Sequence, residues 1–226
     1  MKYRFNIFYQ IHKGLRAMLY DTALSLQLTD FSNTDDAALA FEKLEQVLSV
    51  FHAHASHEDA HILPLLKPFQ PALINEFDSE HEKDEFMTHR INHLVQAYHH
   101  AAGDAKPHAG EAICKAFNEF IAFNLYHMNK EEEKINPVLW GNYSDEQIKA
   151  VQQAIVAGIP KDEMMITSKW MLLGINDTEI IIWLKSIKNN APDFVFQSML
   201  SLAEQVLPNS RWERVQGGLS EGALLA

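Results

Sequence analysis

Two copies of a His-x-x-x-Glu motif are the residues in this chain best suited to chemistry. His54 precedes Glu58 by four residues, and His127 precedes Glu131 by the same interval. Residues four apart lie one above the other on a helix, so each pair aims an imidazole and a carboxylate at one point. In both copies a second acid, an Ile and a Pro follow at matching offsets. Paired motifs of this kind on facing helices build dinuclear iron or manganese sites in helical bundles.

Further imidazoles on other predicted helices could complete the set of ligands. His81 lies on the third long helical segment, and His12 lies at the edge of the apolar face of the first. Taken alone, a histidine such as His12 is more often a structural residue than a ligand. Two metal ions require about six or seven ligands between them. The predicted metal ligands are His12, His54, Glu58, His81, His127 and Glu131.

Hydrophobic periodicity predicts the elements that would position these side chains. Four long helices are expected at residues 3–28, 37–63, 72–101 and 109–134, with Pro137 ending the fourth. Because the connections are short, neighbouring helices should be antiparallel. The fold class expected is therefore all-α, with an up-down-up-down four-helix bundle over residues 1–140.

The remaining residues, 141–226, are expected to form a helical C-terminal extension packed on the bundle or on a partner subunit. Shorter helices are predicted at residues 145–157, 161–173, 177–188 and 192–206. The sequence becomes Gly-rich from Arg211 onward, and we expect this end to fray. A homodimer formed through the extension is an open alternative.

Composition narrows the class of protein. The 226 residues are 47% hydrophobic and carry a formal net charge of −11, which argues against nucleic acid as a partner. Cys114 is the single cysteine, so an internal disulfide and a thiolate-bound metal cluster are both excluded. No apolar leader follows the N-terminus, and no window approaches the ~20 apolar residues of a membrane span. We therefore expect a cytoplasmic protein with no membrane partner.

The first 140 or so residues resemble the hemerythrin-like, or HHE cation-binding, family. The matching residues are the His12-x-x-Leu15-Arg16 start, His54-x-x-x-Glu58-Asp59 with Pro64, Glu80-His81, and His127-x-x-x-Glu131-Glu132 with Pro137. The resemblance implies a four-helix bundle around a centre of two non-haem iron ions, for which manganese or zinc are possible substitutes. It also implies reversible O₂ binding, sensing of O₂ or redox state, or sensing and handling of iron, without choosing among them.

The match to this family has a gap on the third helix. Hemerythrin carries a His-x-x-x-His pair there, whereas His81 is followed four residues later by Glu85. Either Glu85 is a carboxylate ligand, or that coordination position is open to water or substrate. An open position should favour O₂ activation or metal exchange over reversible O₂ carriage. His89 and His93 have the spacing of a pair but lie further round the helix.

His57 and His61 share the face of the second predicted helix that carries His54. They could be hydrogen-bond partners of the metal ligands, because a bound imidazole or carboxylate usually has one. Alternatively, they could be the ligand pair in a register that omits His54. The matching position of the proline in the two motifs favours His54.

The motifs indicate a dinuclear metal site, and the resemblance implies a di-iron protein that binds O₂ or a similar small ligand, or senses O₂, iron or redox state. One alternative is a di-iron enzyme that acts on peroxide or nitric oxide, but a His-rich ligand set favours binding over catalysis. The other alternative is a metal-free helical scaffold. Two buried glutamates without a cation would be strongly destabilising, which argues against the scaffold.

Overall fold

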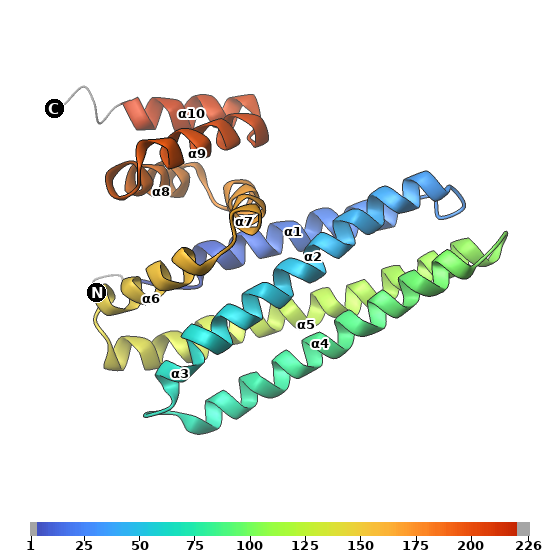
Figure 1. Ribbon diagram of the computed structural model, residues 1–226, viewed down its shortest axis with the longest axis horizontal. Helices are drawn as coiled ribbons and strands as arrows, with labels where there is room; N and C mark the ends of the chain where they lie inside the picture. Colours follow the sequence, from blue (N-terminus) through green and yellow to red (C-terminus); the bar gives the residue numbers. More distant parts are fainter. Residues whose placement is uncertain (1–3, 221–226) are drawn as a thin grey trace. The chain divides into compact units, whose positions relative to one another are not determined.

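Ten helices make up residues 4–220, the part of the chain that the computed structural model describes (Figure 1). They are α1 (Tyr9–Leu28), α2 (Thr34–His61), α3 (Leu63–Leu66), α4 (Pro71–His100), α5 (Ala105–Asn142), α6 (Asp145–Gly158), α7 (Lys161–Gly174), α8 (Asp177–Asn190), α9 (Asp193–Val206) and α10 (Asn209–Ser220). No strand occurs among these described residues, so the predicted all-α class is confirmed. Nor does any of these helices combine the length and the apolarity that crossing a membrane requires.

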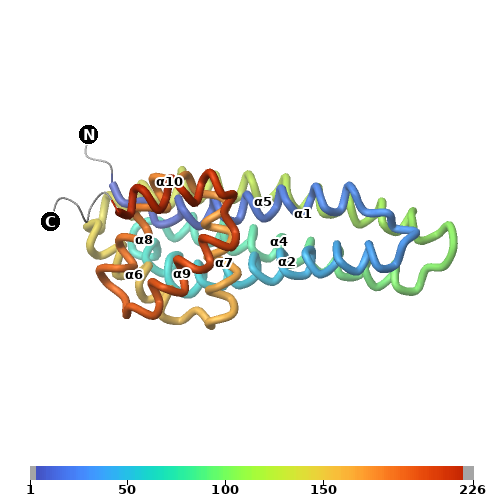
Figure 2. The backbone as a smooth tube through the Cα atoms, turned by 90° about the horizontal axis from the view of Figure 1, so that it is seen from above, coloured from blue at the N-terminus to red at the C-terminus, as the bar shows by residue number. Residues whose placement is uncertain are grey.

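Contacts divide the chain into two units. The first contains the residues up to Tyr9 and Met18–Ile159, and the second contains Gln10–Ala17 with the residues from Pro160 onward. In the first unit, the Met18–Leu28 part of α1 runs alongside α2 and α5, α4 packs against α2 and α5, and successive long helices alternate in direction (Figures 1 and 2). This is the up-down-up-down bundle that the periodicity predicts.

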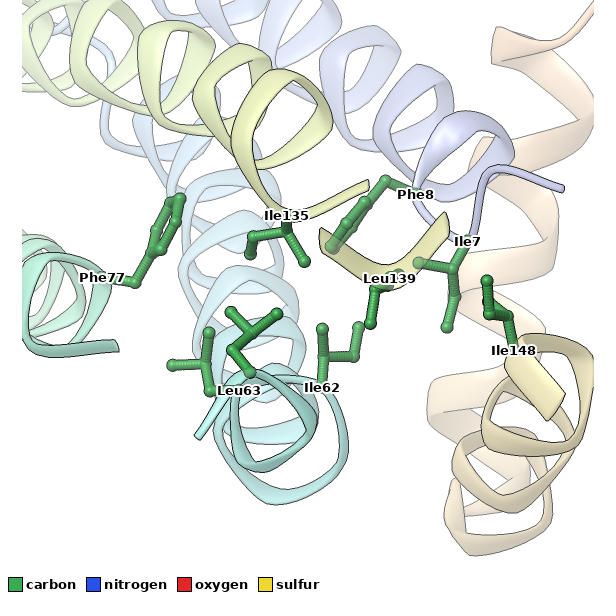
Figure 3. Packing of buried hydrophobic residues seen from close by; sticks show 9 residues of the cluster. Ile7, Phe8, Ile62, Leu63, Phe77, Ile135, Leu139 and Ile148 are labelled. Atoms are coloured by element: carbon green, nitrogen blue, oxygen red, sulfur yellow. The ribbon is translucent and has the colours of Figure 1, made fainter. Parts of the chain in front are cut away.

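A buried apolar cluster closes one end of the bundle (Figure 3). Ile62 follows Glu58 by one turn, and Ile135 follows Glu131 by one turn, so the isoleucines of the two duplicated motifs occupy equivalent places. Both pack in one cluster with Phe77 of α4, and all three are essentially inaccessible to solvent. Burial of each such side chain stabilises the fold by about 1.5–3 kcal/mol. The shared isoleucine therefore has a structural role, which is to form an apolar floor beneath the His and Glu residues.

The sequence predicts that the fourth bundle helix ends at Pro137, and this prediction is wrong. α5 continues through Pro137 to Asn142. Proline inside a helix removes one backbone hydrogen bond and usually kinks or ends it. Here the following turn is held from outside, because Leu139 is fully buried and the Trp140 indole N–H donates to the Phe5 carbonyl at 2.8 Å. Tertiary packing outweighs the local preference for a break.

Close contacts between helices organise the second unit. A Cβ on Gly174 of α7 would lie 2.4 Å from the Lys13 carbonyl oxygen, so this approach requires glycine. Lys13 also forms an ion pair with Glu179 of α8, with a distance of 2.7 Å between Nζ and Oε1. The predicted fraying from Arg211 is wrong as far as Ser220, because this segment lies in α10 and buries Val215 completely. Residues 221–226 lie outside the described part of the chain.

Candidate metal centre

Three helices of the bundle bring the two His-x-x-x-Glu motifs and a third imidazole together. α2 supplies His54 and Glu58, α4 supplies His81, and α5 supplies His127 and Glu131. The Nε2 atom of His54 lies 3.1 Å from Oε1 of Glu58, and Nε2 of His127 lies 3.0 Å from Oε1 of Glu131. Both glutamates are at most 2% exposed. Each motif thus presents one nitrogen and one oxygen at a common point inside the bundle.

The ligand atoms form two overlapping groups. Atoms of His54, Glu58 and Glu131 all lie within 4.8 Å of one another, and so do atoms of Glu58, His81, His127 and Glu131. The two glutamates belong to both groups. Neighbouring ligand groups that share carboxylates have the geometry needed to hold two cations side by side.

His81 and His127 face each other across this cluster. Their Nε2 atoms lie 3.1 Å apart. Nδ1 of His81 is 2.7 Å from Oδ1 of Asp59, and Nδ1 of His127 is 2.7 Å from Oε2 of Glu80. An ionised carboxylate only accepts hydrogen bonds, so each Nδ1 carries a proton and donates it. Two neutral rings would then point their Nε2 lone pairs at each other, and a positive charge between them relieves the repulsion.

The surrounding carboxylates make a positive charge at this cluster more favourable. Burial works against protonation of His81 and His127, but the interaction with Glu131 and the charge of Glu58 outweigh it and raise the pKa of each imidazole to about 9. His54 behaves differently, because its burial dominates and lowers its pKa to about 4. The carboxylates therefore stabilise positive charge beside His81 and His127, whereas burial keeps His54 neutral, with a nitrogen lone pair able to coordinate a cation.

Comparison with known families agrees with this geometry. The sequence model of the Hemerythrin HHE cation binding domain matches residues 5–139. The chain belongs to the hemerythrin HHE cation-binding family. The HHE match includes every predicted ligand and ends before α6. The same comparisons gave no match among curated proteins and none among solved structures.

Lys130 forms ion pairs with two glutamates of α4, one of which contacts the candidate ligand His127. Lys130 Nζ lies 2.5 Å from carboxylate oxygens of both Glu76 and Glu80. Burial opposes ionisation of Glu80, but hydrogen bonds from Lys130 and His127 outweigh it and lower its pKa. Glu80 therefore stays a carboxylate that holds the Nδ1 proton of His127. The Phe77 ring contacts the His127 ring edge-on, with centroids 5.6 Å apart, which restricts its rotation further.

Sequence reasoning missed a second polar pair in the HHE bundle. Asp84 of α4 and Asn124 of α5 are buried, and Asn124 Nδ2 donates to Oδ1 of Asp84 at 2.6 Å. Burial raises the pKa of Asp84, although the hydrogen bond from Asn124 opposes that shift. Asp84 comes three residues after His81, and Asn124 comes three residues before His127. That spacing places each residue on the face of its helix that carries a ligand. The three-residue interval is therefore the sequence signal from which this pair could have been predicted.

Neither ligand group includes the alternative candidates Glu85, His57 or His61. The Glu85 side chain is 60% exposed, and its Oε1 lies 3.5 Å from Nε2 of His89. The buried residues of α4 recur every seven positions, at Phe77, Asp84, Ile91 and Tyr98, and Glu85 falls one position beyond this stripe. His57 and His61 are half-buried on α2.

His12 lies on α1 and is fully buried. Its segment, Gln10–Ala17, groups with the second unit of the chain. Its role as a ligand of the HHE centre therefore stays a prediction.

Proposed function

We propose that this HHE domain holds two non-haem iron ions and uses them to bind O₂ or a similar small ligand, as a carrier or as a sensor of O₂, iron or redox state. The observation that carries the proposal is the pair His81 and His127. Their Nε2 atoms are 3.1 Å apart while both Nδ1 atoms contact carboxylates. Metal-binding histidines characteristically donate their other ring N–H to a carboxylate, which fixes the tautomer and the ring orientation.

The donor set fits two cations. Glu58 and Glu131 occur in both ligand groups, so we assign them as the bridging carboxylates. His81 and His127 would bind one ion, and His54 would bind the other. Imidazole and carboxylate donors together suit iron, with manganese or zinc as substitutes. Bound iron would supply reversible redox chemistry and affinity for O₂.

His12 is the proposed further ligand for the ion on the His54 side. It is fully buried, and it opens the motif through which the sequence resembles the family. α1 is an unbroken helix from Tyr9 to Leu28, so His12 lies on the same helix that contributes Met18–Leu28 to the bundle.

The protein's own groups would prepare the centre for this task. Asp59 and Glu80 accept hydrogen bonds from Nδ1 of His81 and His127, respectively, and so hold the proton of each ring on Nδ1. Both Nε2 atoms are then available to coordinate. Phe51 and Phe120, whose ring centroids are 5.5 Å apart, form an apolar layer one to two turns before the ligands on α2 and α5. This layer and the isoleucine floor restrict water around the centre, which strengthens electrostatic interactions inside it.

A di-iron enzyme that acts on peroxide or nitric oxide is the second candidate, and one observation favours it. α4 contributes His81 to the ligand groups, while Glu85 points to solvent. A coordination position beside His81 would then be open to water or to a substrate. The His-rich donor set still favours binding, because bundles that activate O₂ use more carboxylates.

Metal analysis with an optical spectrum tests the proposal. The purified chain should contain about two iron ions, as a dinuclear site requires. Its near-ultraviolet and visible absorption should change on addition of azide. Stable spectra without turnover support binding, whereas consumption of added peroxide supports the enzyme. A chain that takes up no iron, manganese or zinc would contradict both.

A further inference from the structure

A hollow open to solvent lies beside His81, which is the one proposed ligand among the described residues of its wall. It lies between α2 and α4, has a volume of about 360 Å³, and includes His81 and Asp84 in its wall. Asp78 and Glu82, which also line it, are exposed. None of the described residues that line the hollow is a lysine or an arginine. A small ligand that approached His81 through this hollow would therefore meet negative charge.

Two aspartates of this hollow flank His81 symmetrically along α4. Asp78 precedes His81 by three residues, and Asp84 follows it by three. Asp78 is exposed, whereas only 8% of Asp84 is accessible. Asn124, itself buried, fixes the Asp84 carboxylate by donating to its Oδ1. Asp84 is thus a rigid acidic group in the wall, and Asp78 is a solvated one.

We propose that Asp84, oriented by Asn124, determines which small ligands reach the His81 side of the centre. This inference rests on the proposed function, because it concerns the ligand of that same site. The Asp84 carboxylate repels anions and accepts a hydrogen bond from neutral ligands that carry an O–H or N–H group. The ligands selected are therefore neutral and small, in preference to anions such as azide.

Because Asp84 is buried, its charge should affect ligand binding more strongly than the charge of the exposed Asp78. Charges in a partly buried site interact through a lower effective dielectric constant than charges in water, and salt screens them less. An exposed charge such as that of Asp78 is largely screened, so its loss should have little effect on ligand binding. The pair therefore allows one substitution, Asp→Asn, to be compared at a buried and at an exposed position on the same helix.

Azide titration of the iron-loaded full chain tests the inference. Asp84→Asn should bind azide about tenfold more tightly or better, since removing one partly buried like charge is worth about 1.4 kcal/mol or more. Asp78→Asn should stay within about twofold of the unchanged protein. Both variants should retain their iron. Asn at position 84 can still accept from Asn124 through its amide oxygen, and Asp84→Ser serves as a second variant if Asp84→Asn does not fold.

Binding of nitric oxide, a neutral ligand, distinguishes an effect of the Asp84 charge from an effect on access to the hollow. Its affinity should change by less than about threefold in Asp84→Asn, because no charge is involved in its binding. Equal tightening of azide and nitric oxide would mean that the substitution opens the hollow, and would overturn the role of charge. Unchanged azide affinity with full iron would refute the inference and leave the proposed function standing. Failure of the unchanged protein to bind iron would overturn both.

Discussion

His81 and His127 come from different helices, yet their Nε2 atoms lie 3.1 Å apart and each ring is held from behind by a carboxylate oxygen at 2.7 Å. This arrangement requires that both imidazole rings and both carboxylates be correctly positioned relative to one another. Neutral rings in this arrangement repel, and protonated rings satisfy the carboxylates only at the cost of placing like charges together. A shared cation resolves both conflicts, which is why this pair carries the argument for a metal centre.

Replacing His127 by Ala should remove the metal and lower stability. The substitution deletes one nitrogen ligand and leaves Glu131 and Glu80 without their contacts to the ring. Because metal binding is linked to folding, we expect iron per chain to fall by at least about half and the iron-loaded protein to lose several kcal/mol, about 3–5. Elemental analysis and thermal unfolding measure the two effects.

His108→Ala is the control for this experiment. The His108 side chain is 80% exposed on the same helix, α5. This variant should keep its iron and change in stability by less than about 0.5 kcal/mol. A His127→Ala protein with full iron and an unchanged melting temperature would show that His127 is not a ligand.

Glu80→Gln should weaken metal binding without removing a ligand. Glutamine keeps the shape of the side chain, but it no longer gives the Nδ1 proton of His127 a charged acceptor. Loss of such an outer partner typically costs about 10–100-fold in metal affinity. Glu76→Gln is a matched control, because Lys130 contacts Glu76 and Glu80 equally at 2.5 Å. Competition with a chelator measures the affinities, and equal losses in the two variants would point to Lys130 instead of His127.

Asn124→Ala should destabilise the bundle through Asp84. The substitution leaves a buried carboxylate without its amide donor, which costs about 1–3 kcal/mol. Urea unfolding of the metal-free protein measures this without a contribution from iron. Asn118→Ala, at an exposed position of the same helix, should change stability by less than about 0.5 kcal/mol. Similar small effects in both variants would mean that Asn124 does not support Asp84.

The sequence was sufficient to predict the helical bundle and the two motifs that enter it. The four-residue interval between His54 and Glu58, and between His127 and Glu131, places each pair on one helix face wherever the helices lie. Apolar residues before and after each motif indicate that this face is the buried one. Such local information needs no knowledge of the neighbouring helix.

Contacts between helices could not be read from the sequence in the same way. Glu85 has the better spacing from His81, but α4 packs along a seven-residue stripe that turns Asp84 inward instead. The contact of Glu80 with His127 depends on how α4 and α5 pair, which no single-helix pattern specifies. Pro137 shows the same limit, since the local preference for a break gives way to packing of the following turn.

Acidification should weaken the second unit through Asp177. Its Oδ1 accepts from Arg211 Nε at 2.7 Å and its Oδ2 from Arg214 Nε at 2.6 Å. Burial alone would raise the pKa of Asp177, but these hydrogen bonds and the charges of both arginines outweigh it and lower the pKa below its ordinary value of 3.8. A depressed pKa in the folded state means that the ion pair stabilises fully above about pH 4 and is lost as the pH falls further.

Asp177→Asn should therefore be less stable than the unchanged protein at pH 7, by about 1 kcal/mol for a partly exposed pair of this kind. The difference between the two proteins should shrink as the pH falls from about 4 to 2, because the unchanged protein then loses the same charge. Urea unfolding at pH values of about 7, 4 and 2 follows this difference, and Glu213→Gln, an exposed acid of α10, is the control. A difference that stays constant over this range would show that the hydrogen bonds to Arg211 and Arg214, and not the charge on Asp177, account for its contribution.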